Sequence, residues 1–199
     1  TVTNPPYLRL INRLLMMLPE NAVPSDQVLL ERAIQGDTEV FGDLYERYLA
    51  EIHRYVFYRV ADRFEAEDLT ETVFLKAWEA LSRFKSSGVN FRAWLYRIAH
   101  NTVMDYYRRR KPTEDSPADK LRESRPSPEH QAQARDEQQQ LAAAIRELES
   151  GLQQVIIYRF INGLSHAETA QVMGIREGYV RVLQHRALNQ LRKRLEDEK

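Results

Sequence analysis

Apolar residues recur at intervals of three and four along most of this chain, which places them on one face of an α-helix. A first stripe consists of Phe41, Leu44, Tyr45, Tyr48, Leu49, Ile52, Tyr55 and Val56. A second consists of Leu69, Val73, Ala77, Leu81 and Phe84, and a third, after a helix cap at Asn90, of Phe91, Trp94, Leu95, Ile98, Ala99, Thr102 and Tyr106. Because no segment shows the alternation of a half-buried strand, we predict an all-α fold.

A proline-rich polar segment separates these stripes from the rest of the chain. Residues 111–128 hold four prolines among serines and mixed charges, and such a composition buries too little apolar surface to offset its ordering entropy. We therefore predict two small helical domains joined by a flexible linker. The predicted parts are an N-terminal extension at 1–24, a first domain at 25–111, the linker at 112–127 and a second domain at 128–199.

The net charge is zero, but the charges are unevenly distributed. Basic residues dominate 85–111, where Asp105 is the single acid, and 176–195, where Glu177 is the single acid. Residues 37–79 are instead acidic. Because phosphate binding depends on local positive charge, this pattern favours two contacts with DNA and one with a protein.

Several other classes of protein lack the residues that they require. The chain has no cysteine for disulfides or thiolate metal sites, and no stretch apolar enough to cross a bilayer, so we expect a cytoplasmic protein without membrane insertion. The acids between Asp62 and Glu71 lack the spacing of a calcium loop and are typical of a solvated helix face. No His-Glu-x-x-His, phosphate loop or nucleophile elbow occurs. We expect no metal, cofactor or catalytic residue; an enzyme is the alternative, which intrinsic nuclease or nucleotidase activity would support.

Residues 163–195 carry the pattern of a helix-turn-helix. Ser165 and Glu168 are spaced as a capping box, Gly174 suits a tight turn, and a second helix is expected from Glu177. The inward positions are Ala167, Ala170 and Met173 on the first helix and Val180, Leu183, Ala187 and Leu191 on the second. The outward positions are Arg176, Glu177, Tyr179, Arg181, Val182, His185 and Arg186. An exposed basic helix fits the major groove, where arginine reads guanine edges.

A second candidate DNA-binding surface lies on the helix predicted at 91–106. Opposite its apolar stripe lie Arg92, Tyr96, Arg97, His100 and Asn101, and a basic run follows at 108–111. Aromatic rings beside cations suit single-stranded DNA, because rings stack on unpaired bases while arginines hold phosphates. A solvated basic face beside ordinary core aromatics is the alternative interpretation.

Several short motifs occur in order along residues 26–195. They are Asp68-Leu69, Phe74-Leu75-Lys76-Ala77-Trp78, Trp94-Leu95-Tyr96-Arg97-Ile98-Ala99-His100-Asn101, the arginine run, Gly163-Leu164-Ser165 and Gly174-Ile175. This series resembles the two domains of bacterial RNA polymerase sigma factors of the extracytoplasmic-function (ECF) group. The resemblance implies a non-catalytic initiation subunit that binds core polymerase, recognises the -10 and -35 promoter elements, promotes DNA melting and is controlled by an anti-sigma factor.

The resemblance also implies roles for particular residues. Contact with core polymerase, through its β and β′ subunits, is implied for Asp68, Leu69, Glu71, Phe74 and Leu75. Recognition of the -10 element is implied for Lys85, Asn90, Arg92, Tyr96, Arg97, His100, Asn101, Asp105, Arg108 and Arg109, with a flipped base received by the loop at 85–90. Recognition of the -35 element is implied for the seven outward residues of the second helix, Arg176 to Arg186. The linker is implied to run through the polymerase interior.

The chain departs from the family pattern at two places. Family members usually have a glutamine-glutamate pair where this chain has Glu71-Thr72, and other residues where it has Tyr179 and 181–184. The second departure leaves the promoter sequence open. A helix-turn-helix regulator that binds DNA alone is the competing interpretation, although it gives no role to the segments around Asp68 and Trp94.

Overall fold

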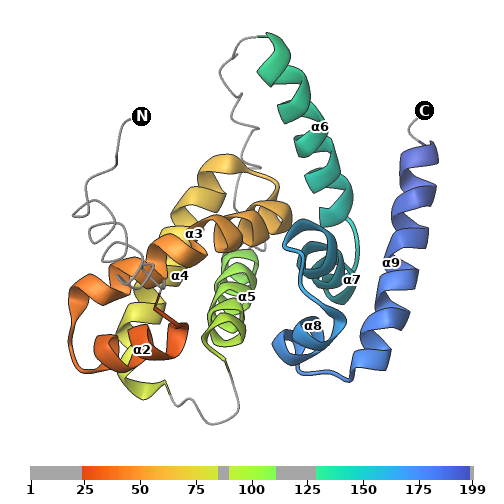
Figure 1. Cartoon of the computed structure of the whole chain (residues 1–199). Coiled ribbons are helices and arrows are strands. Elements are labelled where there is room, and N and C mark those ends of the chain that lie inside the picture. The colour runs from red at the N-terminus through yellow and green to blue at the C-terminus, as the bar shows by residue number, and fades with distance from the viewer. Residues whose placement is uncertain (1–23, 85–89, 111–128, 198–199) are drawn as a thin grey trace, which may run out of the picture.

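The computed structural model describes residues 24–84, 90–110 and 129–197, and within these ranges every regular element is helical (Figure 1). The first group comprises α2 (Asp26–Ile34), α3 (Thr38–Val60), α4 (Arg63–Ala80), the 3-10 helix η1 (Leu81–Arg83) and α5 (Phe91–Arg110). The second comprises α6 (Glu129–Arg146), α7 (Ser150–Ile156), the π-helix η2 (Ile157–Ile161), α8 (His166–Met173) and α9 (Glu177–Asp197). The prediction of an all-α fold is confirmed. The predicted linker, residues 1–23 and Lys85 lie outside the described residues.

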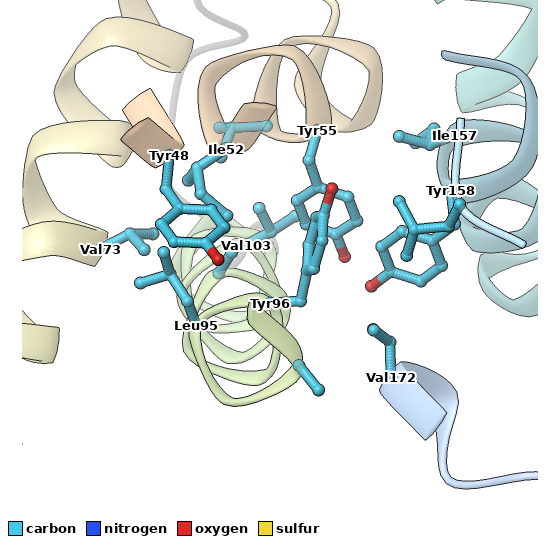
Figure 2. Packing of buried hydrophobic residues seen from close by; sticks show 14 of the residues in the cluster. Tyr48, Ile52, Tyr55, Val73, Leu95, Tyr96, Val103, Ile157, Tyr158 and Val172 are labelled. Atoms are coloured by element: carbon cyan, nitrogen blue, oxygen red, sulfur yellow. The ribbon is translucent and has the colours of Figure 1, made fainter. Parts of the chain in front are cut away.

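Helix α3 is the centre of the first domain and packs against α2, α4 and α5. The stripe predicted on it faces this core, because Leu44, Ile52 and Val56 are fully buried. Figure 2 shows Ile52 together with Val73 of α4 and Leu95 of α5. Burying one aliphatic side chain of this size contributes about 1.5–3 kcal/mol, so the stripes hold the helices together.

The junctions between these helices follow short polar signals. Helix α3 ends at Val60, and the next residue, Ala61, caps it with a left-handed φ of 55°. Asp62 then caps α4 by accepting a hydrogen bond from the N–H of Glu65 at 3.0 Å. Helix α5 begins at its predicted cap, since Asn90 Oδ1 accepts a hydrogen bond from the N–H of Ala93 at 2.8 Å. These caps satisfy amides that have no partner inside the helix.

Helix α2 was not predicted from the sequence. It has 9 residues and buries only Leu29, Leu30 and Ala33, too few for a periodic pattern to stand out. Its first residue, Asp26, pairs with Arg47 of α3 at 2.5 Å and accepts a hydrogen bond from the Tyr48 hydroxyl. Tertiary contacts with α3 therefore hold this helix in place.

The helix-turn-helix of the second domain follows the predicted plan. Ser165 Oγ accepts a hydrogen bond from the N–H of Glu168 at 3.1 Å, and the Glu168 carboxylate accepts one from the N–H of Ser165 at 2.7 Å. Gly174 ends α8 with a φ of 67°, a conformation that glycine adopts without strain. All four predicted inward residues of α9 are buried. Ala167 is exposed, contrary to expectation, because the buried face of α8 consists of Thr169, Ala170 and Val172.

The two domains pack directly against each other. Helix α3 contacts α6 and η2, and α5 contacts α8 (Figure 1). The buried residues of both domains form one cluster, in which Tyr55 and Tyr96 of the first domain meet Tyr158 of the second (Figure 2). Part of the α5 surface that carries the predicted -10 residues is therefore covered by the second domain.

Candidate nucleic-acid and polymerase interfaces

The outer face of α9 and the turn before it are open. All seven residues predicted to read the -35 element are exposed, including the apolar side chains of Tyr179 and Val182. The inward residue Val180 is fully buried and anchors the start of the helix. A packed helix with an unpartnered, mainly basic outer face has the shape required to enter a major groove.

Arg181 is held by an acid on this face. Its guanidinium lies 2.7 Å from the carboxylate of Glu177, one turn earlier in α9. Such an exposed pair contributes little to stability, about 0.3–0.5 kcal/mol. The pair therefore orients Arg181 without making it unavailable to a base edge.

The predicted -10 residues fall on two faces of α5. Arg97, Asn101, Arg108 and Arg109 are exposed. Arg92, Tyr96 and His100, spaced four residues apart, point instead towards the second domain, and Asn90 at the helix start donates to Gln171 of α8 at 3.4 Å. The periodicity of α5 correctly gave one buried stripe, but it did not show that a second face is covered.

Arg92 joins the two domains through two carboxylates. Its Nε lies 2.6 Å from Glu51 of α3, and its Nη1 lies 3.0 Å from Glu168 of α8. Glu168 is also the acid of the capping box. The hydrogen bonds from Ser165 are the main cause that lowers its pKa, and the charge of Arg92 lowers the pKa further. Two carboxylates thus occupy the guanidinium that was predicted to contact DNA.

Tyr96 is buried, which corrects the expectation that it lies on the outer face of α5. Its hydroxyl donates to Glu51 at 2.5 Å and accepts a hydrogen bond from Asn162 Nδ2 at 2.8 Å. Burial raises the pKa of this hydroxyl well above its usual range, and the charge of Glu51 raises it further. Its ring packs edge-on against Tyr158 with centroids 4.9 Å apart, so in this arrangement it cannot stack on a base.

His100 also lies at the domain boundary. Gln154 of α7 donates a hydrogen bond to its Nδ1, and the Tyr55 hydroxyl lies 3.4 Å from the same atom. Burial lowers the pKa of this imidazole, and the nearby Arg59 guanidinium lowers it further. A neutral His100 that accepts at Nδ1 fits this environment.

The outer face of α5 carries a local charge pair. Asp105 lies 2.9 Å from Arg108 and 3.6 Å from Lys76 of α4. Lys76 was not among the predicted DNA-binding residues, although it belongs to the motif at 74–78. Its position beside Asp105 adds a basic residue to this face.

The candidate polymerase surface is a stripe along α4. Phe64, Asp68, Glu71, Leu75 and Trp78 are exposed and recur at the four-and-three spacing of one helix face. Phe64 and Trp78 were not predicted; Phe64 is 58% exposed, and Trp78 remains exposed although its ring packs edge-on against Phe41 of α3. Exposed aromatic and aliphatic side chains flanked by acids are typical of a protein interface.

Phe74 was predicted at this surface, but it is only 4% exposed. Its ring packs edge-on against Tyr45 of α3 with centroids 4.7 Å apart. Leu69 is partly buried, since it packs against the hydrophobic core. Phe74 therefore packs in the core beneath the exposed stripe and is not part of the stripe's surface.

The acids at the start of α4 have roles in the helix itself. Asp62 is the N-cap, and Glu67 pairs with Arg63 at 3.1 Å. Within the part of the chain that the structure describes, no three or more potential metal-ligating side chains come together. In the same ranges no helix combines the length and apolarity that a membrane crossing requires.

Two family matches define the class of protein to which these surfaces belong. Residues 44–113 match Sigma-70 region 2, and residues 144–193 match Sigma-70, region 4. The first match contains α4 and α5, and the second contains the helix-turn-helix. Sigma factors of this class are initiation subunits of RNA polymerase.

Similar proteins narrow the class further. The chain is 38% identical over 174 residues to the ECF RNA polymerase sigma factor BldN of Streptomyces coelicolor; the match covers 85% of this chain and 66% of BldN, just under two thirds of that protein. It is 33% identical over 183 residues to the RNA polymerase sigma-H factor of Pseudomonas aeruginosa, covering 86% of this chain and 94% of that factor. The chain therefore belongs to the ECF family of RNA polymerase sigma factors.

Solved structures agree with this fold. CnrH in complex with the cytosolic domain of CnrY is similar with a TM-score of 0.69 and 27% identity, covering 87% of this chain and 99% of CnrH. RpoE in complex with the anti-sigma factor NepR from Bartonella quintana is similar with a TM-score of 0.59. At 21% identity, over 80% of this chain and 98% of RpoE, the second similarity shows the fold alone.

Proposed function

We propose that this chain binds core RNA polymerase, recognises the -10 and -35 elements of its promoters and promotes DNA melting. The observation that carries the proposal is the open basic face of α9, where all seven predicted residues are exposed on a packed helix-turn-helix. In a member of the ECF sigma family, this face is the reader of the -35 element. Arg181 and Arg186 are its arginines suited to guanine edges.

The outer face of α5 is the proposed -10 surface. Arg97, Arg108 and Arg109 supply phosphate contacts, and Asn101 supplies donors and acceptors for a base edge. The loop at 85–90, whose residues 85–89 lie outside the described ranges, is proposed to receive a flipped base. A pocket that binds only an extruded base shifts the duplex equilibrium towards the open form.

The exposed stripe of α4 is the proposed contact with core polymerase. Leu75 and Phe64 supply apolar area, and Asp68 and Glu71 supply charge at its edge. Small exposed apolar clusters of this kind become the desolvated centre of an interface. We place the protein in the cytoplasm, where core polymerase and DNA are found.

An anti-sigma factor is the proposed regulator. CnrH and RpoE were both solved with protein partners, CnrY and NepR. The similarity to CnrH covers nearly all of that chain, which supports a partner of the same kind here. Co-purification with the product of a neighbouring gene is the direct check.

Reconstituted transcription tests the proposed function. The purified chain is added to core polymerase on genomic DNA, and the RNA start sites are mapped. We expect starts at a common set of promoters, and an Asn101→Ala variant that forms closed complexes but gives weaker permanganate reactivity of the -10 thymines. Asn189→Ala, an exposed asparagine of α9, is the matched control. An absence of defined start sites overturns the proposal.

The competing proposal, a regulator that binds DNA alone, predicts a different result. Such a protein shifts a specific duplex tightly without polymerase. The exposed stripe of α4 favours the sigma function, because a regulator acting alone leaves that stripe without a partner. A mobility-shift assay with and without core polymerase separates the two.

A further inference from the structure

Gln184 of α9 joins three segments of the second domain through one oxygen atom. Its Oε1 accepts a hydrogen bond from Nε of Arg159 in η2 at 3.2 Å, and Nε2 of His166 in α8 lies 3.1 Å from the same oxygen. Gln184 is half-buried and is not among the residues assigned to DNA or polymerase. It belongs to 181–184, where this chain departs from the usual family pattern. The sequence pattern therefore gave this residue no role.

The hydrogen-bond donors determine which way the Gln184 amide points. An arginine Nε carries a hydrogen and cannot accept one, so the atom that faces Arg159 has to be the amide oxygen. His166 Nε2 then faces an oxygen that only accepts, so this nitrogen carries a hydrogen. The chemistry of Arg159 thus determines both the orientation of Gln184 and the ring nitrogen of His166 that donates.

Arg159 is itself held by the turn that precedes α8. Its Nη1 donates a hydrogen bond to the carbonyl oxygen of Leu164, and the Leu164 side chain is buried. His166 is the first residue of α8, directly after the N-cap Ser165. Both partners of Gln184 are therefore attached to backbone that the core and the helix cap hold in place.

The apolar contacts of α9 are less directional than these hydrogen bonds. Four buried side chains hold α9 against the domain: Val180, Leu183, Ala187 and Leu191. Apolar burial is non-directional, whereas a hydrogen bond weakens steeply when its angle changes. A rotation of about 20° moves the side-chain ends of a helix about 10–12 Å in diameter by about 2 Å. A bidentate contact with a base edge is lost at such a displacement.

Gln184 lies within the part of α9 that carries the proposed -35 residues. Arg181 is three positions before it, and Arg186 is two positions after it. Both arginines are exposed, whereas Gln184 faces η2 and α8. A hydrogen bond at Gln184 therefore fixes the rotation of the helical turns from which both arginines project.

We propose that Gln184 is a positioning residue for -35 recognition. Its contacts with Arg159 and His166 hold α9 at the rotation at which the exposed residues of this helix meet base edges. Gln184 acts through those residues and does not itself contact DNA. This inference rests on the proposed function, because it concerns how α9 reads the -35 element.

Three variants of the full-length chain test this role. Gln184→Leu keeps a side chain of similar size and removes the acceptor, whereas Gln184→Glu keeps an oxygen for both donors. Gln190→Leu makes the first change at an exposed position of the same helix and is the matched control. Thermal unfolding and a titration with core polymerase establish that each variant folds and binds.

The first readout is promoter preference. Polymerase holding each variant transcribes a mapped promoter and versions of it with single base changes in the -35 element. We expect Gln184→Leu to reduce the preference for the unchanged promoter by at least about fivefold, the lower end of what one bidentate base contact supplies. Gln184→Glu and Gln190→Leu are expected to keep the wild-type preference. A lower rate with unchanged preference in Gln184→Leu overturns the proposal, as does an equal loss of preference in Gln184→Glu.

The second readout is the ring N–H of His166, observed by nitrogen-15 NMR of the free chain. We expect the wild type and Gln184→Glu to show an Nε2 hydrogen protected from exchange, and Gln184→Leu to lose this protection. A wild-type chain without it lacks the contact, which contradicts the positioning role. If the wild type starts no RNA at any defined site, the proposed function fails, and a protected Nε2 hydrogen distinguishes that failure from a missing contact.

Discussion

Phe74 and Leu75 are neighbours in α4, yet Phe74 is 4% exposed and Leu75 is 59% exposed. The helix turns about 100° between them, so one points into the core beside Tyr45 and the other to the outer stripe. Both belong to one sequence motif. Their different environments predict opposite consequences of the same substitution.

Leu75→Ala is expected to weaken binding to core polymerase and leave stability nearly unchanged. Loss of an apolar anchor from an interface costs about 1–2 kcal/mol, which is about fivefold to thirtyfold in Kd. Phe74→Ala is expected to destabilise the first domain by about 3–5 kcal/mol instead. Urea unfolding and a polymerase binding titration measure the two effects. Equal binding by Leu75→Ala and wild type would remove α4 from the interface.

Arg181→Ala is expected to relax promoter choice at the -35 element. Loss of one bidentate contact to a base costs about 1–3 kcal/mol of discrimination. Polymerase binding and folding are expected to be retained, because Arg181 is exposed and its pair with Glu177 is weak. Transcription from promoters with single changes in the -35 element measures the preference. Arg192→Ala, an exposed arginine near the end of α9, is the control, and an unchanged preference in Arg181→Ala contradicts the assigned role.

Stability is expected to fall as the pH decreases below about 6.5, the ordinary pKa of histidine. The folded pKa of His100 is lowered by burial and by Arg59, so the unfolded chain takes up a proton on this residue at higher pH than the folded chain does. The contribution of His100 to the free energy of unfolding is therefore fully present above pH 6.5. It is lost as the pH falls from 6.5 to the lowered pKa of His100 in the folded chain. His53, whose pKa burial also lowers, acts in the same direction.

The urea midpoint measured at a series of pH values checks this expectation. The His100→Gln variant should show a smaller loss across the window, with His53 accounting for part of the remainder. Glu168 acts separately and at lower pH, because its lowered pKa removes stability only as the pH falls below its ordinary value of 4.5. A pH dependence in His100→Gln equal to that of the wild type would show that His100 is not responsible.

Ala61→Gly is expected to stabilise the protein by about 0.5–1 kcal/mol. The left-handed conformation costs an alanine about 1–2 kcal/mol, while the added freedom of glycine in the unfolded chain costs about 0.4–1 kcal/mol. Ala50→Gly, the same change at an exposed position inside α3, is expected to destabilise by about 1 kcal/mol. Thermal or urea unfolding compares them, and a destabilised Ala61→Gly variant would contradict the conformational argument.

Much of the secondary structure and the helix-turn-helix followed from local pattern. The stripe on α3, the cap at Asn90, the capping box of Ser165 and Glu168 and the turn at Gly174 all depend on residues within a few positions of one another. Residues that are a few positions apart in such a feature are also neighbours in space, so their spacing in the sequence predicts their contact. That is also why the exposed face of α9 was predicted residue by residue.

Contacts between distant segments settled the position of the short helix α2, the burial of Phe74 and Tyr96 and the partial burial of Arg92. Arg92 meets Glu168 across 76 positions, and Tyr96 meets Asn162 across 66. A helical pattern shows that a face is apolar or polar, but not which other element covers it. Tyrosine and arginine, which have apolar bodies and polar ends, suit both a wet surface and a hydrogen-bonded boundary, so only the packing of the two domains decided which of these they occupy.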